Sequence, residues 1–314
     1  MIVVTGGAGF IGSNLIQALN GEGEERILVI DRRGDNFRNL SDLRISDFME
    51  PEDFRRAIEA GHSFGSITAI YHQGACADTT SSDERYMMEN NFAFSRAVLH
   101  FALDGKIPLV YASSASVYGT SHDSRALPTN ERPLNLYAQS KLAFDNYFRG
   151  LTGRAESTVV GLRYFNVYGP RERYKGRMAS MVYQLFKQVE ESGSAKLFEG
   201  TDGYGNGEQR RDFVFVGDVV RINLFFARLT KVRRGIFNVG TGTGRSFNDV
   251  ARAVITNLGA GNIQYIPFPS ELEGKYQSFT QADLTALRAA SWNAAFTSIE
   301  DGVAVSARAW TEGS

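Results

Sequence analysis

The stretch VTGGAGFIGSNL, residues 4–15, decides the fold because a cluster of glycines joins a short apolar run to a helical pattern. The cluster satisfies both the GxGxxG and the GxxGxxG spacing, with Gly6, Gly7, Gly9 and Gly12. Glycines at such a turn let the backbone approach a pyrophosphate, which then sits at the N-terminus of the helix. Asp31 follows 19 residues after Gly12, where a carboxylate binds an adenosine ribose. The stretch predicts a dinucleotide site, and a glycine-rich turn without a ligand is the alternative.

Short apolar runs alternate with longer helical patterns through the first half of the chain. The runs lie at 2–5, 26–31, 69–75, 108–114 and 157–169, and the helical patterns include 14–21 and 87–105. Near-continuous apolar strands that alternate with helices indicate a parallel sheet covered on both faces. We therefore expect an α/β protein with a Rossmann-type doubly wound parallel sheet and a smaller α/β substrate-binding lobe.

The pattern loosens after about residue 170, so we expect a second part of the chain there. The segments 213–229 and 235–254 return to a strand followed by a helix, with Ser246 as the expected N-cap and Asp249 three residues on. We expect residues 1–165 plus about 212–240 to form a dinucleotide-binding domain. The remainder, about 166–211 plus 241–314, is the expected substrate-binding lobe.

Composition excludes several classes of protein. The chain has 314 residues, is 43% hydrophobic and carries a net charge of −1, which argues against nucleic acid or an anionic membrane as the main partner. It has no run of the ~18 apolar residues that a membrane span needs, and no basic secretory signal at its start. The single Cys76 excludes an internal disulfide, and the 4 histidines show no metal-ligand spacing. We therefore expect a soluble cytoplasmic protein without a metal site.

A tyrosine and a lysine lie four residues apart in LNLYAQSKLAFD, residues 134–145. On a helix Tyr137 and Lys141 share a face, and an ordinary helix with an exposed lysine is the alternative. A free phenol has a pKa near ~10, and a nearby ammonium and a positive nicotinamide ring would favour the phenolate, so Tyr137 could act as a general base. Upstream, YASSASVYG (111–119) ends a predicted strand at the ligand side of the sheet, which makes candidates of the hydroxyls of Ser113, Ser114 and Ser116.

The glycine loop, the serine at a strand end and the YxxxK pair together resemble the extended short-chain dehydrogenase/reductase family over essentially the whole chain. The segments NN (90–91) and LRYFNVYGP (162–170) are similar to that family as well. By this resemblance Ser114 is the catalytic serine and Ser116 contacts the substrate. Dehydratases of the family carry acidic residues where this chain has Ala115 and Ser116, so the resemblance argues against dehydration.

Further motifs are similar to one branch of the family, the epimerases that invert C6″ of an ADP-linked heptose. The motifs are GACADTT (74–80), YMMENN (86–91), RYFNVYGPRE (163–172), KGRMAS (175–180), KLFEG (196–200), RRDFVFVGDV (210–219) and GKYQSFTQADL (274–284). The resemblance implies that a hydride leaves C6″ for a bound nicotinamide, the 6-keto sugar reorients, and the same hydride returns to its other face. It also implies a place in lipopolysaccharide core precursor synthesis and a homo-oligomer, with a pentamer as the candidate assembly.

Inversion requires proton transfer in two orientations of the sugar. One base is poorly placed for both, because proton transfer needs hydrogen-bond reach. In the related enzymes a second base lies across the pocket, and the matching residue is Lys175. From the residues alone, the simpler alternative is a surface lysine in a basic loop, since Arg171, Arg173 and Arg177 surround it. A desolvated Lys175 would have the lowered pKa that a base requires.

The motifs and the resemblance together assign two sets of binding residues. Those expected to hold the cofactor are Gly6, Gly9, Phe10, Ile11, Gly12, Asp31, Arg32, Gln73, Gly74, Ala75, Cys76, Asn90, Tyr137, Lys141 and Val167. Those expected to hold the substrate are Ser116, Asn166, Arg177, Gln184, Phe198, Glu199, Gly200, Thr201, Arg211 and Tyr276. Arg211 suits a pyrophosphate by its charge and fork geometry, with a structural salt bridge to Asp212 or Asp218 as the alternative.

The residues after the second predicted strand bear on the choice of cofactor. Asp31 favours the free hydroxyls of NAD, whereas Arg32 and Arg33 suit the 2′-phosphate of NADP. We expect NADP, with NAD as the alternative. Two other functions stay open: another nucleotide-sugar epimerase or reductase of the same family, and a dinucleotide-binding sensor without catalysis.

Overall fold

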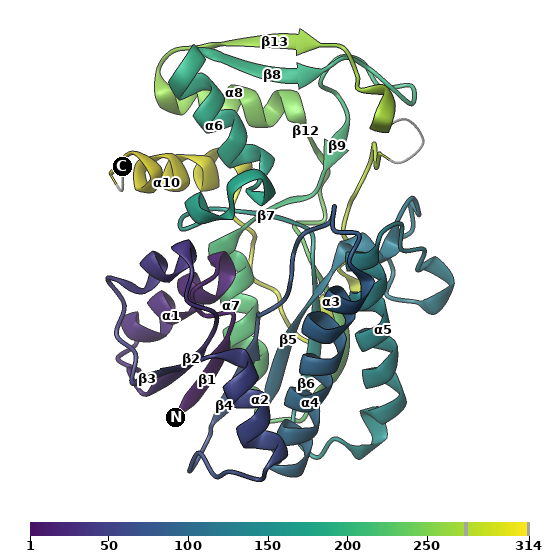
Figure 1. Ribbon diagram of the computed structural model, residues 1–314. Coiled ribbons are helices and arrows are strands. Elements are labelled where there is room, and N and C mark those ends of the chain that lie inside the picture. The colour runs from purple at the N-terminus through teal and green to yellow at the C-terminus, as the bar shows by residue number, and fades with distance from the viewer. Residues whose placement is uncertain (273–275, 313–314) are drawn as a thin grey trace. The chain divides into compact units, whose positions relative to one another are not determined.

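The computed structural model describes residues 1–272 and 276–312, so Gly274 and Lys275 of the GKYQSFTQADL motif lie outside the described residues (Figure 1). The chain divides into two compact units. The first contains residues 1–117, 133–163 and 220–237, and the second contains residues 118–132, 164–219 and 238–314. Within the described residues, no helix combines the length and the apolar character needed to cross a membrane.

The first unit is built on a seven-stranded sheet with the order β11-β6-β5-β4-β1-β2-β3. The pairings from β3 through β5 are parallel. The strands are β1 (Ile2–Thr5), β2 (Ile27–Ile30), β3 (Asp47–Met49), β4 (Ala69–His72), β5 (Leu109–Ser114), β6 (Val159–Tyr164) and β11 (Arg234–Val239). Four of them, β1, β2, β4 and β6, are buried along their whole length, which explains why their sequences read as continuous apolar runs.

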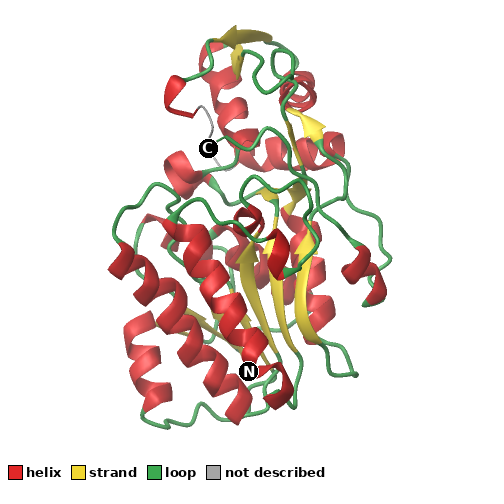
Figure 2. Cartoon of the chain, turned by 90° about the vertical axis from the view of Figure 1, so that its right-hand side faces the viewer, coloured by secondary structure: helices red, strands yellow, loops and turns green. Residues whose placement is uncertain are grey.

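The sheet grows in opposite directions from β1, toward β2 on one side and toward β4 on the other. Because crossovers between parallel strands are right-handed, the helices that follow β1 and β4 cover opposite faces, and the sheet is doubly wound. Figure 2 shows helices packed along the sheet. The helices are α1 (Phe10–Gly21), α2 (Pro51–Glu59), α3 (Glu84–Met88), α4 (Phe94–Asp104), α5 (Leu136–Leu151) and α7 (Val216–Ala227). The predicted Rossmann-type fold is confirmed.

Three predicted segments differ in detail from the structure. The apolar run 157–169 is two strands, because β6 ends at Tyr164 and β7 (Asn166–Tyr168) pairs with β10 (Phe213–Phe215) in another sheet. The helical pattern 87–105 is interrupted by a π-helical turn, η2 (Glu89–Ala93), between α3 and α4. Helix α1 begins at Phe10, inside the glycine motif. Short 3₁₀ turns complete the chain: η1 (Asp35–Leu40), η3 (Ala115–Tyr118), η4 (Pro128–Asn130), η5 (Thr152–Arg154), η6 (Arg173–Met178) and η7 (Ser270–Leu272).

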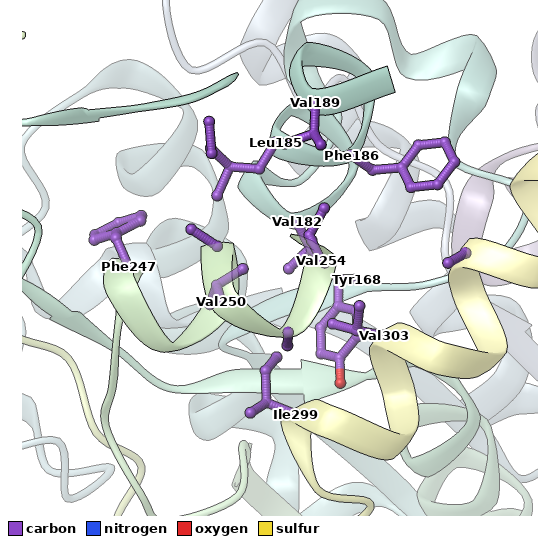
Figure 3. Packing of buried hydrophobic residues seen from close by; sticks show 14 of the residues in the cluster. Tyr168, Val182, Leu185, Phe186, Val189, Phe247, Val250, Val254, Ile299 and Val303 are labelled. Carbon is purple, nitrogen blue, oxygen red and sulfur yellow. The ribbon is translucent and has the colours of Figure 1, made fainter. Parts of the chain in front are cut away.

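The second unit packs helices against short strand pairs. Its helices are α6 (Met181–Ser192), α8 (Phe247–Leu258), α9 (Thr285–Ala289) and α10 (Ile299–Glu312). Its other strands are β8 (Ser194–Phe198) with β13 (Asn262–Ile266) and β9 (Arg210–Arg211) with β12 (Arg245–Ser246). Figure 3 shows the core that α6, α8 and α10 form around Tyr168. The predicted cap of α8 is confirmed, since Ser246 and Asp249 form a reciprocal capping box.

Residues 118–132 and 212–219 belong to the second unit by their contacts. The division expected from the sequence placed them in the first. Local hydrogen bonds explain this grouping. The Tyr118 hydroxyl donates to Asn238 over 2.6 Å, and the Asp212 carboxylate accepts from the Thr241 amide over 2.6 Å. The roles of the two parts in cofactor and substrate binding stay predictions.

Two helical glycines provide a matched test of the packing. In α10, a Cβ added to Gly302 would overlap the hydroxyl of the buried Tyr168, so Gly302→Ala should lower the free energy of unfolding by about 1–3 kcal/mol. In α5, a Cβ added to Gly150 would meet no atom within 4 Å, so Gly150→Ala should raise that free energy by about 0.5–1 kcal/mol. Denaturant unfolding measures both. Equal stabilisation of the two variants would contradict the packing around Tyr168.

Candidate active site

The glycine loop between β1 and α1 leaves no room for side chains at two of its positions. Gly6 has φ of +67°, and a Cβ added to it would lie 2.5 Å from the backbone nitrogen of Gly74. A Cβ on Gly12 would overlap the carbonyl oxygen of Gly6. The Gly9 amide closes the turn by donating to that same oxygen over 3.0 Å. The loop after β1 and the loop after β4 are therefore in contact through their backbones, at the point where the sheet reverses direction.

The carboxylate of Asp31 lies beside this loop, immediately after β2. It accepts hydrogen bonds from the amides of Ala8 (2.9 Å) and Arg32 (2.8 Å). Burial raises its pKa, and these backbone bonds oppose the rise. The structure thus brings Asp31 to the glycine loop, as the spacing of the two motifs predicted.

A cavity of about 550 Å³ opens in the first unit beside the glycine loop. Its volume falls in the range of small-molecule sites. Predicted cofactor residues line much of it: Gly6, Asp31, Arg32, Gly74, Ala75, Cys76 and Asn90. Its wall also includes residues outside the set assigned to the cofactor: Ile30, Pro51, Glu52, Arg55, Asp83, Arg85, Tyr86, Glu89 and Phe94. Glycines that admit a close ligand and a carboxylate at the end of β2 fit a dinucleotide.

Arg32 lines this cavity beside Asp31, and the exposed Arg33 follows it in the chain. Arg32 donates to the Tyr86 hydroxyl (2.7 Å) and to the Asn90 side chain (3.0 Å), and it forms an ion pair with Glu52. The guanidinium of Arg33 lies over two rings, 5.5 Å from the centre of Phe37 and 5.3 Å from that of Phe48. The positive charge of Arg32 is therefore shared with a carboxylate, whereas Arg33 is held by aromatic faces.

Helix α5 and the end of β5 bring together three of the predicted catalytic residues, Ser114, Tyr137 and Lys141. The Asn135 side chain caps α5 by accepting from the Ala138 amide over 2.8 Å, which places Tyr137 in the first turn. Lys141 is buried, and its Nζ donates to the Ala112 carbonyl over 2.9 Å and lies 6.0 Å from the centre of the Tyr137 ring. The alternative of an exposed lysine is wrong.

A serine completes this arrangement. The hydroxyl of Ser114 interacts with the phenol of Tyr137, and that interaction lowers the pKa of the phenol. The Ser116 hydroxyl in turn donates to the Ser114 oxygen over 2.8 Å. The first unit therefore contains one group formed by Ser114, Tyr137 and Lys141. Ser116 joins it through its hydrogen bond to Ser114.

The titration of this group differs from the expectation. Burial raises the pKa of Tyr137, and the Ser114 hydroxyl only partly opposes the rise. Burial also lowers the pKa of Lys141 to about 8, while the Asp145 carboxylate acts in the opposite direction. The neighbouring lysine therefore does not by itself favour the phenolate, because the phenol is buried with it. The prediction also invoked the positive charge of a nicotinamide ring, which is the remaining influence that would favour the phenolate.

A buried asparagine that the sequence analysis did not assign holds the wall of the cavity in place. Asn91 lies in the π-helical turn, accepts from the Cys76 amide (2.7 Å), and donates to the Cys76 carbonyl (3.0 Å) and to Ser140 (3.0 Å). It thereby ties the cavity wall to α5. The NN pair at 90–91 is the sequence feature that could have identified Asn91, but only Asn90 of the pair was assigned a role.

The histidine at the end of β4 is a core residue. His72 bridges the hydroxyls of Thr5 (2.6 Å) and Ser95 (2.7 Å), and burial lowers its pKa to about 3. His72 is therefore a buried, neutral imidazole that links β1 to α4. Among the other predicted cofactor residues, Gln73 donates to Asn223 over 2.9 Å within the first unit, whereas Val167 lies in β7 of the second unit.

In the second unit, a buried carboxylate organises the segment that carries Lys175. Glu172 accepts from the Gly169 amide (3.0 Å) and from both the amide (2.6 Å) and the hydroxyl (2.9 Å) of Ser180. Lys175 lies on η6 within this segment and is half-buried. Burial lowers the pKa of Lys175 and Glu172 opposes the shift, so its direction is the one that a base requires. Its burial argues against an ordinary surface lysine.

Other predicted substrate residues of the second unit gather around Arg211. The guanidinium of Arg211 lies 4.7 Å from the centre of the Tyr276 ring and 5.7 Å from that of Phe247. The Phe198 and Tyr276 ring centres are 6.4 Å apart. Asp212 is occupied elsewhere, because it accepts from the amides of Thr241, Gly242 and Ala282. The alternative of an Arg211–Asp212 salt bridge is therefore wrong.

The remaining predicted substrate residues lie after β8, on η6, at the start of α6 and in β7. Glu199, Gly200 and Thr201 follow β8, where the Gly200 amide donates to the Asn206 side chain over 2.9 Å. Gln184 donates to the backbone carbonyls of Arg177 (3.2 Å) and Ala179 (2.9 Å), so it secures the start of α6. Arg177 is exposed on η6, and Asn166 is exposed in β7.

The sequence matches the NAD dependent epimerase/dehydratase family over residues 2–240. This chain belongs to that family. It is 53% identical over 305 residues to the ADP-L-glycero-D-manno-heptose-6-epimerase of Alkalilimnicola ehrlichii, a match that covers 96% of this chain and 95% of the relative. The resemblance found in the sequence is confirmed, and the family makes the cofactor an NAD-type dinucleotide.

Solved structures support the same relation. The ADP-L-glycero-D-manno-heptose-6-epimerase of Helicobacter pylori is 32% identical, with a TM-score of 0.83 over 97% of this chain and 94% of that one. The UDP-glucose 4-epimerase of Thermus thermophilus, solved in complex with NAD, is 28% identical, with a TM-score of 0.80 over 100% of this chain and 99% of that one. The fold of the family thus extends over the length of this chain.

Proposed function

We propose that this chain is an epimerase that inverts C6″ of ADP-D-glycero-D-manno-heptose to give ADP-L-glycero-D-manno-heptose, by transient oxidation to a 6-keto sugar. The observation that carries the proposal is the 53% identity, over 96% of the chain, to a relative named for this heptose. The grouping of Ser114, Tyr137 and Lys141 supports it, because these side chains suit the oxidation of an alcohol.

The side chains of the first unit handle the proton of the C6″ hydroxyl. When bound, the nicotinamide dinucleotide supplies a hydride acceptor that becomes the hydride donor in the return step. Tyr137 takes the hydroxyl proton as the alcohol becomes a ketone and returns it in the reverse direction. Ser114 holds the reacting oxygen by hydrogen bonding, and the Lys141 ammonium stabilises the phenolate. Oxidation and reduction balance, so no external reductant is consumed.

Inversion needs a second proton donor and acceptor for the other orientation of the sugar. We infer that Lys175 has this role. Its lowered pKa lets a neutral amine form more easily, and the Glu172 anchors fix the segment that carries it. In this two-base mechanism Tyr137 and Lys175 would serve opposite epimers.

The aromatic group around Arg211 is the proposed site for the ADP part of the substrate. A guanidinium binds a diphosphate through parallel hydrogen bonds, and flat rings such as Phe198 and Tyr276 suit adenine. Arg211 is buried, so its charge is little screened and its attraction for an anion is strong. The loop 199–209 joins the end of β8 at Phe198 to β9 at Arg210–Arg211, and the Gly207 amide helps to close it by donating to the Phe198 carbonyl over 2.9 Å.

For the cofactor we propose NADP. Arg32 and Arg33 stand beside Asp31 at the expected adenosine ribose, and both suit a 2′-phosphate. NAD is the competing outcome, because Glu52 shares the charge of Arg32. A cytoplasmic location, a place in lipopolysaccharide core synthesis and a homo-oligomer stay predictions.

Purified protein should convert ADP-D-glycero-D-manno-heptose to a mixture of C6″ epimers without added cofactor. Tyr137→Phe should lower kcat by about 10²–10⁴-fold while the dinucleotide stays bound, because proton transfer loses its base. Tyr147→Phe on the same helix is the control, since Tyr147 bonds His100 and should leave kcat unchanged. NMR of the sugar C6″ proton measures turnover. No epimerisation by the wild type, with dinucleotide binding unchanged in Tyr137→Phe, would favour a binding protein. Stoichiometric consumption of NADPH would favour a reductase, and full epimerase activity in Tyr137→Phe would contradict its role as the base.

The second base has its own test. Lys175→Met removes the amine and keeps an apolar stem. It should lower kcat for epimerisation by at least about 10²-fold. Lys187→Met is the matched control, because Lys187 pairs with Glu190 on the exposed side of α6. Epimer ratios followed over time measure both variants. Wild-type turnover in Lys175→Met would end the two-base mechanism.

The bound nucleotide can be identified directly. Denaturing freshly purified protein should release NADP, because two guanidinium groups stand near the proposed ribose. Chromatography and mass spectrometry of the released nucleotide measure this. Release of NAD alone would show that Asp31 and Glu52 determine which of the two dinucleotides binds.

A further inference from the structure

A buried carboxylate on α5 collects hydrogen bonds from two strands. Asp145 accepts from the Tyr111 hydroxyl (3.0 Å) and the Ser113 hydroxyl (2.9 Å) of β5. It also accepts from Nε (2.9 Å) and a terminal nitrogen (2.8 Å) of Arg163 on β6. The Asp145 and Arg163 side chains are both 0% exposed. Four buried donor atoms therefore converge on one side chain.

The position of this cluster relates it to the catalytic group. Asp145 lies one helical turn after Lys141 and two turns after Tyr137, on the same face of α5. Ser113 directly precedes Ser114, and Lys141 Nζ binds the carbonyl of Ala112. The end of β5 is therefore joined to α5 twice, through Lys141 at Ala112 and through Asp145 on either side of it. This double attachment fixes the spacing of the serine from the tyrosine and the lysine.

The cluster also sets the charge around Lys141. Asp145 is the anion that favours the protonated amine, whereas burial disfavours it. The other titratable groups that act there are the Tyr137 phenol, the Cys76 thiol and the neutral His72. Arg163, on β6, pairs with Asp145 and shares its charge.

We propose that Asp145 is a positioning residue for the Tyr137–Lys141 pair, which clamps the end of β5 to α5 and places a carboxylate one helical turn from Lys141. Asp145 acts through Lys141 and Ser113 rather than on the substrate. The competing explanation is a buried ion pair that only stabilises the fold, since removing one partner of such a pair is costly wherever it lies.

Asp145→Asn separates the two explanations, because it keeps the shape and removes the charge. In the cofactor-bound protein, the titration midpoint of Lys141 should fall by about one pH unit or more, since a nearby opposite charge commonly shifts a pKa by that amount. NMR of ¹³C-labelled lysine side chains measures it, with the Lys141 signal identified by its loss in Lys141→Arg. In the epimerase assay kcat should fall at least about tenfold, with the KM for ADP-heptose changed by less than about twofold.

Asp218→Asn is the control for a purely structural effect. Asp218 is equally buried, anchors the Thr297 amide over 2.8 Å, and lies in the second unit. It should lower the melting temperature but leave the Lys141 titration and kcat unchanged. If Asp145→Asn behaves in the same way, the proposal is overturned.

Two further variants keep the proposal testable if Asp145→Asn does not fold. Ser113→Ala and Tyr111→Phe each remove one donor and leave the charge in place, so they should lower kcat without moving the Lys141 titration. Wild-type kcat in the double variant would overturn the clamp. The proposal rests on the proposed function only for kcat, because the titration needs no substrate. A shifted titration without any epimerase activity would refute that function and leave the charge effect standing.

Discussion

The backbone contact between the loops after β1 and β4 is the constraint on which the rest of the structure depends. Gly6 approaches Gly74 so closely that the loop after β1 has no room for a side chain at the crossing, and a Cβ on Gly74 would lie 3.0 Å from the backbone nitrogen of Gly6. The crossing lies where the sheet reverses its direction, and there the carboxyl ends of parallel strands leave an opening. The cavity, the carboxylate of Asp31 and the cavity wall at Cys76 are all placed by the strands that meet at this point.

Buried polar groups, rather than apolar packing alone, hold this region in register. His72 joins β1 to α4, Asn91 joins the loop after β4 to α5, and Asp145 joins α5 to β5 and β6. Burying such groups is costly unless every one finds partners, so these links are specific about which segments may meet. The second unit uses the same principle at Glu172, which fixes the turn that carries Lys175.

The sequence predicted those parts of the fold and the site that depend on local pattern. Continuous apolar runs located β1, β2 and β5 to within a residue or two, and the glycine spacing located the turn beside Asp31. The break between β6 and β7 was not predictable, because the apolar run continues through Phe165, whose amide instead bonds the carbonyl of Val239. Val239 lies far from Phe165 in the sequence, so no local pattern identifies it as the hydrogen-bond partner.

The titration of the site was harder to predict for a related reason. A pKa depends on how deeply a group is buried and on which charges face it, and both follow from tertiary contacts. The spacing of Tyr137 and Lys141 indicated the pair correctly, but burial of the phenol reversed the expected direction of its shift. Asp145, which reaches Arg163 across 18 residues of sequence, could not be recognised as the neighbouring anion.

The π-helical turn at Glu89–Ala93 has a consequence for how this region tolerates change in length. A helical turn with one additional residue rotates everything before it by about 100° relative to everything after it, since an α-helix has 3.6 residues per turn. The widened turn therefore lets Asn91 face inward while α3 and α4 each keep their own apolar side toward the protein. Loss of one residue here would leave a continuous helix whose two halves could no longer both be packed correctly.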